Sequence, residues 1–137
     1  MPTPNPDALT FLQTRRSRPA KTLAMPVPDR AELELLLTAA ARTPDHGKLE
    51  PWRFIEIEKT AMPRMTAIAQ TRGMALGLDE EQVKKGRGQF DQGHLAVAVI
   101  EVQKSSPKIP ALEQTYSVGA VCLALLNAAL AAGWGAN

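Results

Sequence analysis

The sequence predicts a mixed fold of helices and strands in a single domain over residues 1–137. Five segments carry the hydrophobic spacing or the capping residues of α-helices, and two short segments are rich in the aromatic and β-branched residues typical of strands. Hydrophobic residues make up 45% of the chain. A chain of this length can bury about two-thirds of the surface that its unfolded form exposes. We therefore expect one domain with one hydrophobic core.

The first predicted element is a short helix. Asn5 can cap it, and Pro6 suits its first position because proline lacks the backbone N–H that a first helical residue leaves unpaired. Its buried face would be formed by the apolar residues that precede Arg15, namely Ala8, Leu9, Phe11 and Leu12. Residues 19–28 contain three prolines and indicate an extended connector.

The second helix has the clearest signal in the chain. Asp29 and Glu32 have the spacing of a capping box, in which each side chain accepts a hydrogen bond from the other residue's backbone N–H. Pro44 disfavours helical geometry at Thr43, so the helix must end before it. Apolar residues recur along one face of this helix: Leu33, Leu36, Leu37, Ala40 and Ala41.

Two segments predict strands, residues 52–57 and residues 95–102. The second is apolar over nearly its whole length, which indicates a strand that is buried on both faces at the centre of a sheet. Between the strands we expect a helix over about residues 60–72 and a short helix capped by Asp79. Residues 73–93 hold five glycines and most of the local charge, so we expect them to form a mobile cover.

The C-terminal part of the chain predicts one long helix. No charged residue follows Glu113, and the apolar run over residues 118–136 is long enough to cross a bilayer. Most of that run is alanine and glycine and Asn127 interrupts it, so we expect no membrane partner. We expect instead a helix buried in a core or a dimer interface, with Gly133 as its stop. Cys122 lies in this run and is expected to be a small buried residue.

Charge and composition argue against several partners. The formal net charge is only +2, from 16 basic and 14 acidic residues, so a nucleic-acid partner has little electrostatic support. The first six residues lack the basic patch and the apolar stretch of a secretory signal. A single cysteine cannot form an intrachain disulfide. These observations favour a cytoplasmic protein.

Two basic turns are the main indication of function. Arg15-Arg16-Ser17 closes the first helix, and Arg42 and His46 flank the proline corner after the second. Two cation-rich helix ends in one small domain suggest a bound anion, most simply a phosphate. Structural roles remain open: an arginine can neutralise a helix C-terminus, Ser17 can close a turn, and His46 can hydrogen-bond to the backbone at the corner.

These motifs, taken in order, resemble the nitroreductase-like flavoprotein family. The remaining parts of the pattern are Pro44-Asp45-His46 after the second helix, Pro51-Trp52 at the start of a strand, and a small-residue helix that ends in Gly133-Trp134-Gly135. The resemblance covers nearly the whole chain and is closest to the compact branch that carries a Pro-Asp-His turn. It implies an α+β fold with a central antiparallel-rich sheet flanked by helices.

The resemblance also implies a homodimer with FMN at the subunit interface. The flavin would be reduced by NADH or NADPH and reoxidised, in a ping-pong exchange, by a small-molecule acceptor such as a nitroaromatic, a quinone or an activated alkene. Arg15, Arg16 and Ser17 match the family's first FMN-binding motif, and Arg42 and His46 match a second group that contacts the cofactor. Because FMN carries the redox chemistry, we assign no catalytic residue and no metal ligand.

Three departures from the family pattern leave alternatives open. Glu50 stands where many relatives have glutamine, Pro19 displaces the basic residue that usually follows Arg-Arg-Ser, and the later cofactor-binding segment has no counterpart up to Asn137. We therefore expect the C-terminal part of the fold to be missing from these residues, unless a partner chain supplies a further strand, and a chain ending at Asn137 to hold flavin poorly. The alternatives are a flavin-binding protein without efficient turnover and a cofactor-free helical interaction module.

Overall fold

The structure is a computed structural model that describes residues 2–137, and these residues form two compact units. The first unit contains residues 2–18, 28–53 and 99–137, and the second contains residues 19–27 and 54–98. The expectation of a single domain stays a prediction.

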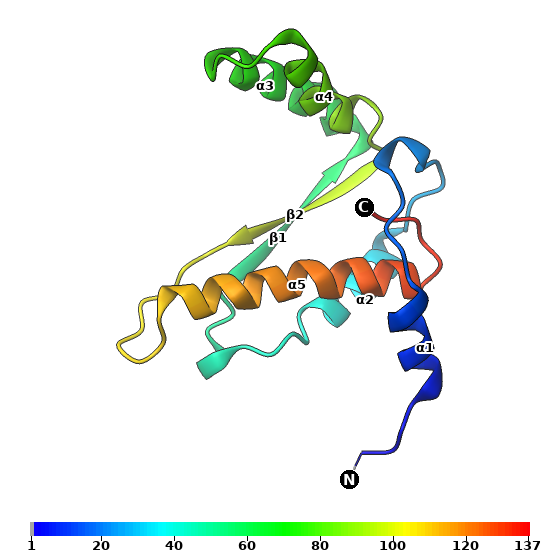
Figure 1. The fold of residues 1–137 in the computed structure, drawn as a ribbon, viewed down its shortest axis with the longest axis vertical. Helices are drawn as coiled ribbons and strands as arrows, with labels where there is room; N and C mark the ends of the chain where they lie inside the picture. The colour runs from blue at the N-terminus through cyan, green and yellow to red at the C-terminus, as the bar shows by residue number, and fades with distance from the viewer. Residues whose placement is uncertain (1) are drawn as a thin grey trace. The chain divides into compact units, whose positions relative to one another are not determined.

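The helices and strands follow one another along the described chain in the predicted order (Figure 1). They are α1 (Pro6–Thr14), α2 (Arg30–Ala40), β1 (Trp52–Glu58), α3 (Met62–Ala75), α4 (Glu80–Asp91), β2 (Leu95–Glu101) and α5 (Ala111–Ala131). Three short 3₁₀ helices lie between them: η1 (Ala20–Thr22), η2 (His46–Lys48) and η3 (Lys59–Ala61). The expected extended connector is therefore wrong at η1, where the backbone N–H and the hydroxyl of Thr22 both donate to the Pro19 carbonyl at 2.8 Å.

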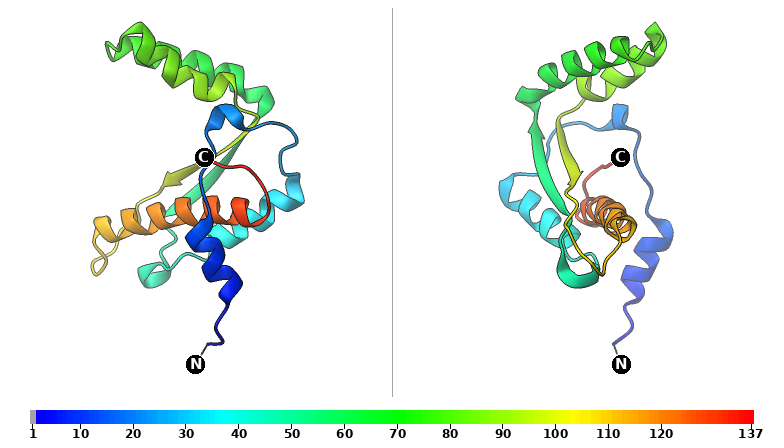
Figure 2. Two further views of the ribbon diagram at one scale, coloured as in Figure 1. Left: turned by 45° about the vertical axis from the view of Figure 1, so that its right-hand side comes forward. Right: turned by 90° about the vertical axis from the view of Figure 1, so that its left-hand side faces the viewer.

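The core of the first unit is the contact between α2 and α5, which lie side by side in both views (Figures 1 and 2). The capping box of α2 is confirmed, since Glu32 N–H donates to Asp29 Oδ1 at 2.9 Å and Asp29 N–H donates to Glu32 Oε2 at 2.8 Å. The predicted stripe is confirmed at Leu33, Leu36 and Ala40, whereas Leu37 is half-buried and Ala41 is exposed. The buried residues of the two helices are Leu33, Leu36 and Ala40 of α2 and Gln114, Val118 and Val121 of α5.

Three predictions of burial in this unit are wrong or only partly right. No residue of α1 is buried, although Asn5 caps the helix by accepting from Ala8 N–H at 3.0 Å. Cys122 is exposed. Only one face of α5 is buried. Apolar residues occur all around this helix, but α2 covers only one side of it. Of the described helices, α5 is long and apolar enough to cross a membrane, a property that core helices of soluble proteins share.

The sheet consists of β1 and β2, which run antiparallel (Figure 1). Beyond the end of β2, Val102 N–H donates to the Pro51 carbonyl at 2.7 Å and continues the pairing. The prediction that residues 95–102 form a central strand buried on both faces is wrong for the described chain, since residues 95–100 are only half-buried and β1 is their one neighbour. An apolar strand sequence shows that its surface should be covered, but not which element covers it.

The second unit contains a hairpin of α3 packed on α4. The predicted cap of α4 is confirmed, since Gln82 N–H donates to Asp79 Oδ1 at 2.8 Å. Gly73 is buried where the helices meet, and a Cβ there would lie 3.0 Å from Val83 Cγ2. Arg87 adds a hydrogen bond of 2.8 Å to Gln70. Most of residues 73–93 are thus helical, but α4 has no buried residue, so the expectation of a mobile cover stays a prediction.

Candidate functional site

The first basic turn begins at the end of α1. Arg15 is the C-cap of this helix, and its backbone N–H donates to the Phe11 carbonyl at 2.8 Å. Its side-chain atom Nη1 is buried and has no hydrogen-bond partner within residues 2–137. Leaving a charged donor buried and unpaired is costly, so a missing acceptor is the simplest explanation of this geometry. The site at Arg15 therefore fits an anionic ligand.

The rest of this turn lies against the segment that follows α5. Arg18 N–H donates to the Ala136 carbonyl at 2.8 Å, and Asn137 Nδ2 donates back to the Arg18 carbonyl at 3.0 Å. Arg16 and Ser17 are exposed beside this pairing. The pairing depends on the end of α5, where Gly133 has a positive φ of 87° and stops the helix as predicted.

The second basic turn follows α2, which ends at Ala40 before the Pro44 corner, as predicted. Arg42 is exposed in this turn. Asp45 Oδ2 accepts a hydrogen bond of 2.6 Å from Glu50 N–H and so closes the segment between them. Within the segment the backbone takes positive φ values of 73° at Gly47, 53° at Lys48 and 47° at Glu50. Glycine adopts such a conformation freely, but at Lys48 and Glu50 it persists only where surrounding contacts enforce it, so this turn has a strongly defined shape.

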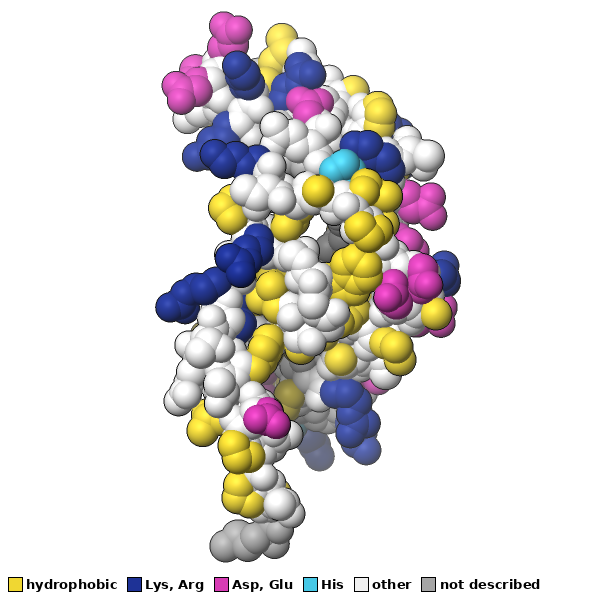
Figure 3. Space-filling view, turned by 90° about the vertical axis from the view of Figure 1, so that its right-hand side faces the viewer, with side chains coloured by type: hydrophobic (Ala, Val, Ile, Leu, Met, Phe, Trp, Pro, Cys, Tyr) yellow, Lys and Arg dark blue, Asp and Glu magenta, His cyan; other side chains and the backbone are white. Residues whose placement is uncertain are grey.

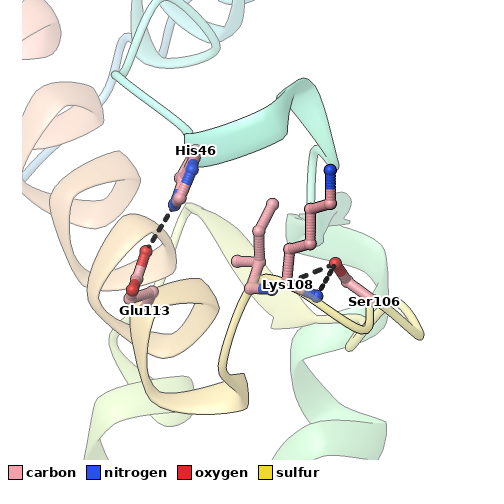
Figure 4. A network of polar contacts seen from close by, with 5 residues as sticks. His46, Ser106, Lys108 and Glu113 are labelled. Carbon is pink, nitrogen blue, oxygen red and sulfur yellow. Dashed lines mark hydrogen bonds and ion pairs between the residues drawn. The ribbon is translucent and has the colours of Figure 1, made fainter.

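The first turn of α5 supplies one of these contacts, and the segment just before it supplies another. His46 Nδ1 lies 2.7 Å from Glu113 Oε2 (Figure 4). A Cβ added at Gly47 would clash with Ile109 Cδ1, just before α5. The alternative that His46 bonds to the backbone at its own corner is wrong, because its partner is this carboxylate 67 residues away. Sequence reasoning missed Glu113, whose only signal was its place as the last charged residue before the apolar run.

The two basic turns lie toward opposite ends of α5 in this unit. Glu113, the partner of His46, is the third residue of α5, whereas Ala136, the partner of Arg18, follows its last residue, Ala131. The helix between Glu113 and Ala131 rises about 27 Å at 1.5 Å per residue. Figure 1 shows α1 near the C-terminal end of α5 and the turn after α2 near its N-terminal half. One subunit therefore does not bring the predicted site residues together.

Other kinds of site find little support in the described residues. They contain no group of three or more His, Cys, Asp or Glu side chains arranged to hold a metal ion. On the face drawn in Figure 3, basic and acidic side chains form small separate groups and hydrophobic side chains are exposed between them. The two basic turns remain the best candidates for ligand binding.

Comparison with known proteins connects these turns with a family. The family model described as "Nitroreductase family" matches residues 12–137, which include both turns. The chain belongs to the nitroreductase family. It is therefore an oxidoreductase with an α+β fold, as the sequence motifs predicted.

Two bacterial relatives of this nitroreductase-family chain are similar in sequence. The "Putative NAD(P)H nitroreductase YdjA" of Escherichia coli strain K12 is 35% identical over 129 residues, which are 94% of this chain and 69% of the relative. The "Putative NAD(P)H nitroreductase" of Haemophilus influenzae is 33% identical over 129 residues, with 93% and 69% covered. The chain thus spans about two-thirds of the length of these relatives.

A solved structure supports the fold. The crystal structure of a nitroreductase-like family protein from Bacillus cereus superposes with a TM-score of 0.72 at 20% sequence identity, covering 97% of this chain and 68% of that one. The helices and strands described above therefore follow the arrangement of a longer nitroreductase-like chain.

Proposed function

We propose that the protein is an FMN-dependent NAD(P)H oxidoreductase. The observation that supports this most directly is the buried, unpartnered Nη1 atom of Arg15 within residues 2–137, at the Arg-Arg-Ser turn that resembles the family's FMN-binding motif. A phosphate dianion supplies the acceptor that this guanidinium lacks, and guanidinium–phosphate hydrogen bonds are strong because both partners are charged. Arg16 and Ser17 would add a second cation and a neutral hydroxyl donor beside it.

The chain's role in this proposal is to bind and orient the flavin. When bound, FMN supplies reversible hydride transfer, so the chain needs no catalytic acid or nucleophile of its own. Arg42 and His46 would contact the cofactor away from its phosphate. NAD(P)H and a nitroaromatic, quinone or activated-alkene acceptor would occupy one place in turn, which is a ping-pong order. The relatives' names, which include NAD(P)H, support the choice of donor.

We propose that each flavin site is completed by two subunits of a homodimer. A helix rise of about 27 Å separates Glu113, the partner of His46, from the end of α5, beside which the first basic turn lies. This separation supports a site in which the two turns that contact one cofactor come from different subunits. The two-fold symmetry of a homodimer would then create two identical composite sites.

The exposed face of α5 is the surface that we assign to this dimer. Leu112, Tyr116 and Leu123 are 57%, 67% and 50% exposed and, with Ala120, form one stripe at helical spacing, the α5 stripe. We expect Leu123→Glu to convert the dimer to monomers in sedimentation velocity at micromolar concentration. Leu35→Glu, at an exposed leucine of α2, is the matched control and should leave the dimer intact.

Mixed dimers test the composite site. Arg15→Ala and Arg42→Ala subunits, carried on two different affinity tags, would be co-expressed, and the dimers containing one of each would be isolated. Each homodimeric variant should hold little flavin. The mixed dimer has one site that lacks both arginines and one that lacks neither, so it should bind about one FMN per dimer. A mixed dimer without flavin would show that both arginines act within one subunit and would refute the composite site.

One observation favours the alternative of a flavin-binding protein without efficient turnover. Glu50, held at a positive φ by Asp45, places a carboxylate directly before Pro51 and Trp52. Negative charge near the flavin would disfavour its anionic reduced form. Steady-state NAD(P)H oxidation with added quinone and nitroaromatic acceptors separates the two functions. We assign the protein to the cytoplasm in either case.

A further inference from the structure

His46 is held from both sides of its turn. Asp45 closes the segment through Glu50, and Gly47 fits against Ile109, so the backbone on each side of the ring has little freedom. The ring itself is fixed by Glu113, whose Oε2 lies 2.7 Å from Nδ1 (Figure 4). The side chains of His46 and Glu113 are 64% and 46% exposed. Exposed ion pairs contribute little to stability, so folding alone does not explain why the ring is held.

The contact determines which ring nitrogen carries a hydrogen. An ionised carboxylate has only acceptor atoms, so the hydrogen bond at 2.7 Å requires a hydrogen on Nδ1. In the neutral ring this leaves Nε2 without a hydrogen and makes it an acceptor. A neutral His46 therefore offers an acceptor to any ligand that it faces.

We propose that Glu113 is a positioning residue for His46 and that it keeps Nε2 as a hydrogen-bond acceptor for a donor group of the flavin outside the phosphate. Donors of this kind are the ribityl hydroxyls and the ring N–H. This assignment rests on the proposed function. In it, two types of group bind different parts of the flavin: the guanidinium of Arg15 donates to the phosphate, and the imidazole of His46 accepts from the uncharged part.

Three variants of the full chain test the assignment. Glu113→Ala removes the acceptor for Nδ1–H, whereas Glu113→Gln keeps an amide oxygen that can still accept it. Glu34→Gln is the matched control, because Glu34 also forms an exposed pair, with Arg30 on α2 at 2.9 Å. Thermal unfolding of each flavin-free protein would show that the variants are folded.

The first measurement is the tautomer of His46 in the flavin-free protein, from ring ¹⁵N and ¹³C shifts at pH 8, above the usual titration range of histidine. We expect the hydrogen on Nδ1 in the wild-type protein and in the Glu113→Gln and Glu34→Gln variants. Glu113→Ala should shift the ring toward the Nε2–H form. The same ring signals in all four proteins would overturn the proposal.

The second measurement is the dissociation constant for FMN and for riboflavin, which lacks the phosphate. Glu113→Ala should weaken both by the same factor, about 3- to 10-fold for one neutral hydrogen bond. Arg15→Ala should weaken FMN alone. If Glu113→Ala weakens the binding of FMN but not of riboflavin, His46 lies at the phosphate. If Glu113→Gln weakens flavin binding as much as Glu113→Ala does, the charge of Glu113 matters rather than its acceptor oxygen. Either result overturns the assignment. If the unchanged protein binds neither flavin, the proposed function fails as well.

Discussion

Replacing Arg15 with alanine should change stability and flavin binding in opposite directions. In the flavin-free protein Nη1 is buried without an acceptor in the described chain, a condition that costs about 1–3 kcal/mol for a polar donor. Arg15→Ala removes that cost but also loses the packing of a side chain whose residue is only half-buried. We expect the free energy of unfolding of the flavin-free protein to be unchanged or to rise by up to about 1 kcal/mol.

The same substitution should weaken FMN binding. A hydrogen bond to a charged group contributes about 1.5–3 kcal/mol, which corresponds to a dissociation constant about 10- to 150-fold higher. Urea unfolding of the flavin-free protein and fluorescence titration with FMN measure the two quantities. Arg72→Ala, at an exposed arginine of α3, is the control and should change neither. An Arg15→Ala protein that loses stability but binds FMN normally would show that Arg15 serves the end of α1 instead.

Three further substitutions test the packing that supports the site, each by urea unfolding. Gly47→Ala should lower the free energy of unfolding by about 1–2 kcal/mol, because alanine is strained at the positive φ and its Cβ meets Ile109. An unchanged unfolding midpoint would show that the turn relaxes freely. Asp29→Ala should cost about 0.5–2 kcal/mol through loss of the α2 cap, and no loss would mean that Glu32 or water replaces it. Leu36→Ala should cost about 2–5 kcal/mol because it leaves a cavity between α2 and α5, whereas a cost below 1 kcal/mol would contradict that core.

Features that depend on neighbouring residues were predicted well. The caps at Asn5, Asp29 and Asp79 each join groups three residues apart, so the sequence contains both partners. The stop at Gly133 depends on the backbone freedom of one residue. The fold class followed from these elements together with the family resemblance, and the fold comparison confirms it.

Burial was predicted less well because it depends on elements far apart in the sequence. An apolar pattern in β2 or around Cys122 shows which surface avoids water, but not how many neighbours are present to cover it. In the described chain β2 has β1 alone beside it, and α2 covers one side of α5. The same apolar residues therefore appear as half-buried or exposed.

In the candidate site, too, local features were predicted and contacts between distant residues were not. Its local motifs were evident from Arg15-Arg16-Ser17 and from the Pro44 corner. The contacts that shape them were not: Glu113 lies 67 residues from His46, and no spacing rule connects them. Whether the assigned residues bind a flavin stays a prediction that the mixed dimers and the titrations address.

The pairing of Arg18 with Asn137 has a consequence for the order in which parts of the protein fold. These residues are 119 positions apart, so this contact cannot form until nearly the whole described chain has been synthesised. Contacts between distant positions also form slowly, since a long loop must close before they are gained. The N-terminal Arg-Arg-Ser segment, although made first, would reach its final shape among the last parts of the molecule. Cofactor uptake at the proposed site would then be a late event in biogenesis, and nascent chains lacking α5 should fail to capture FMN.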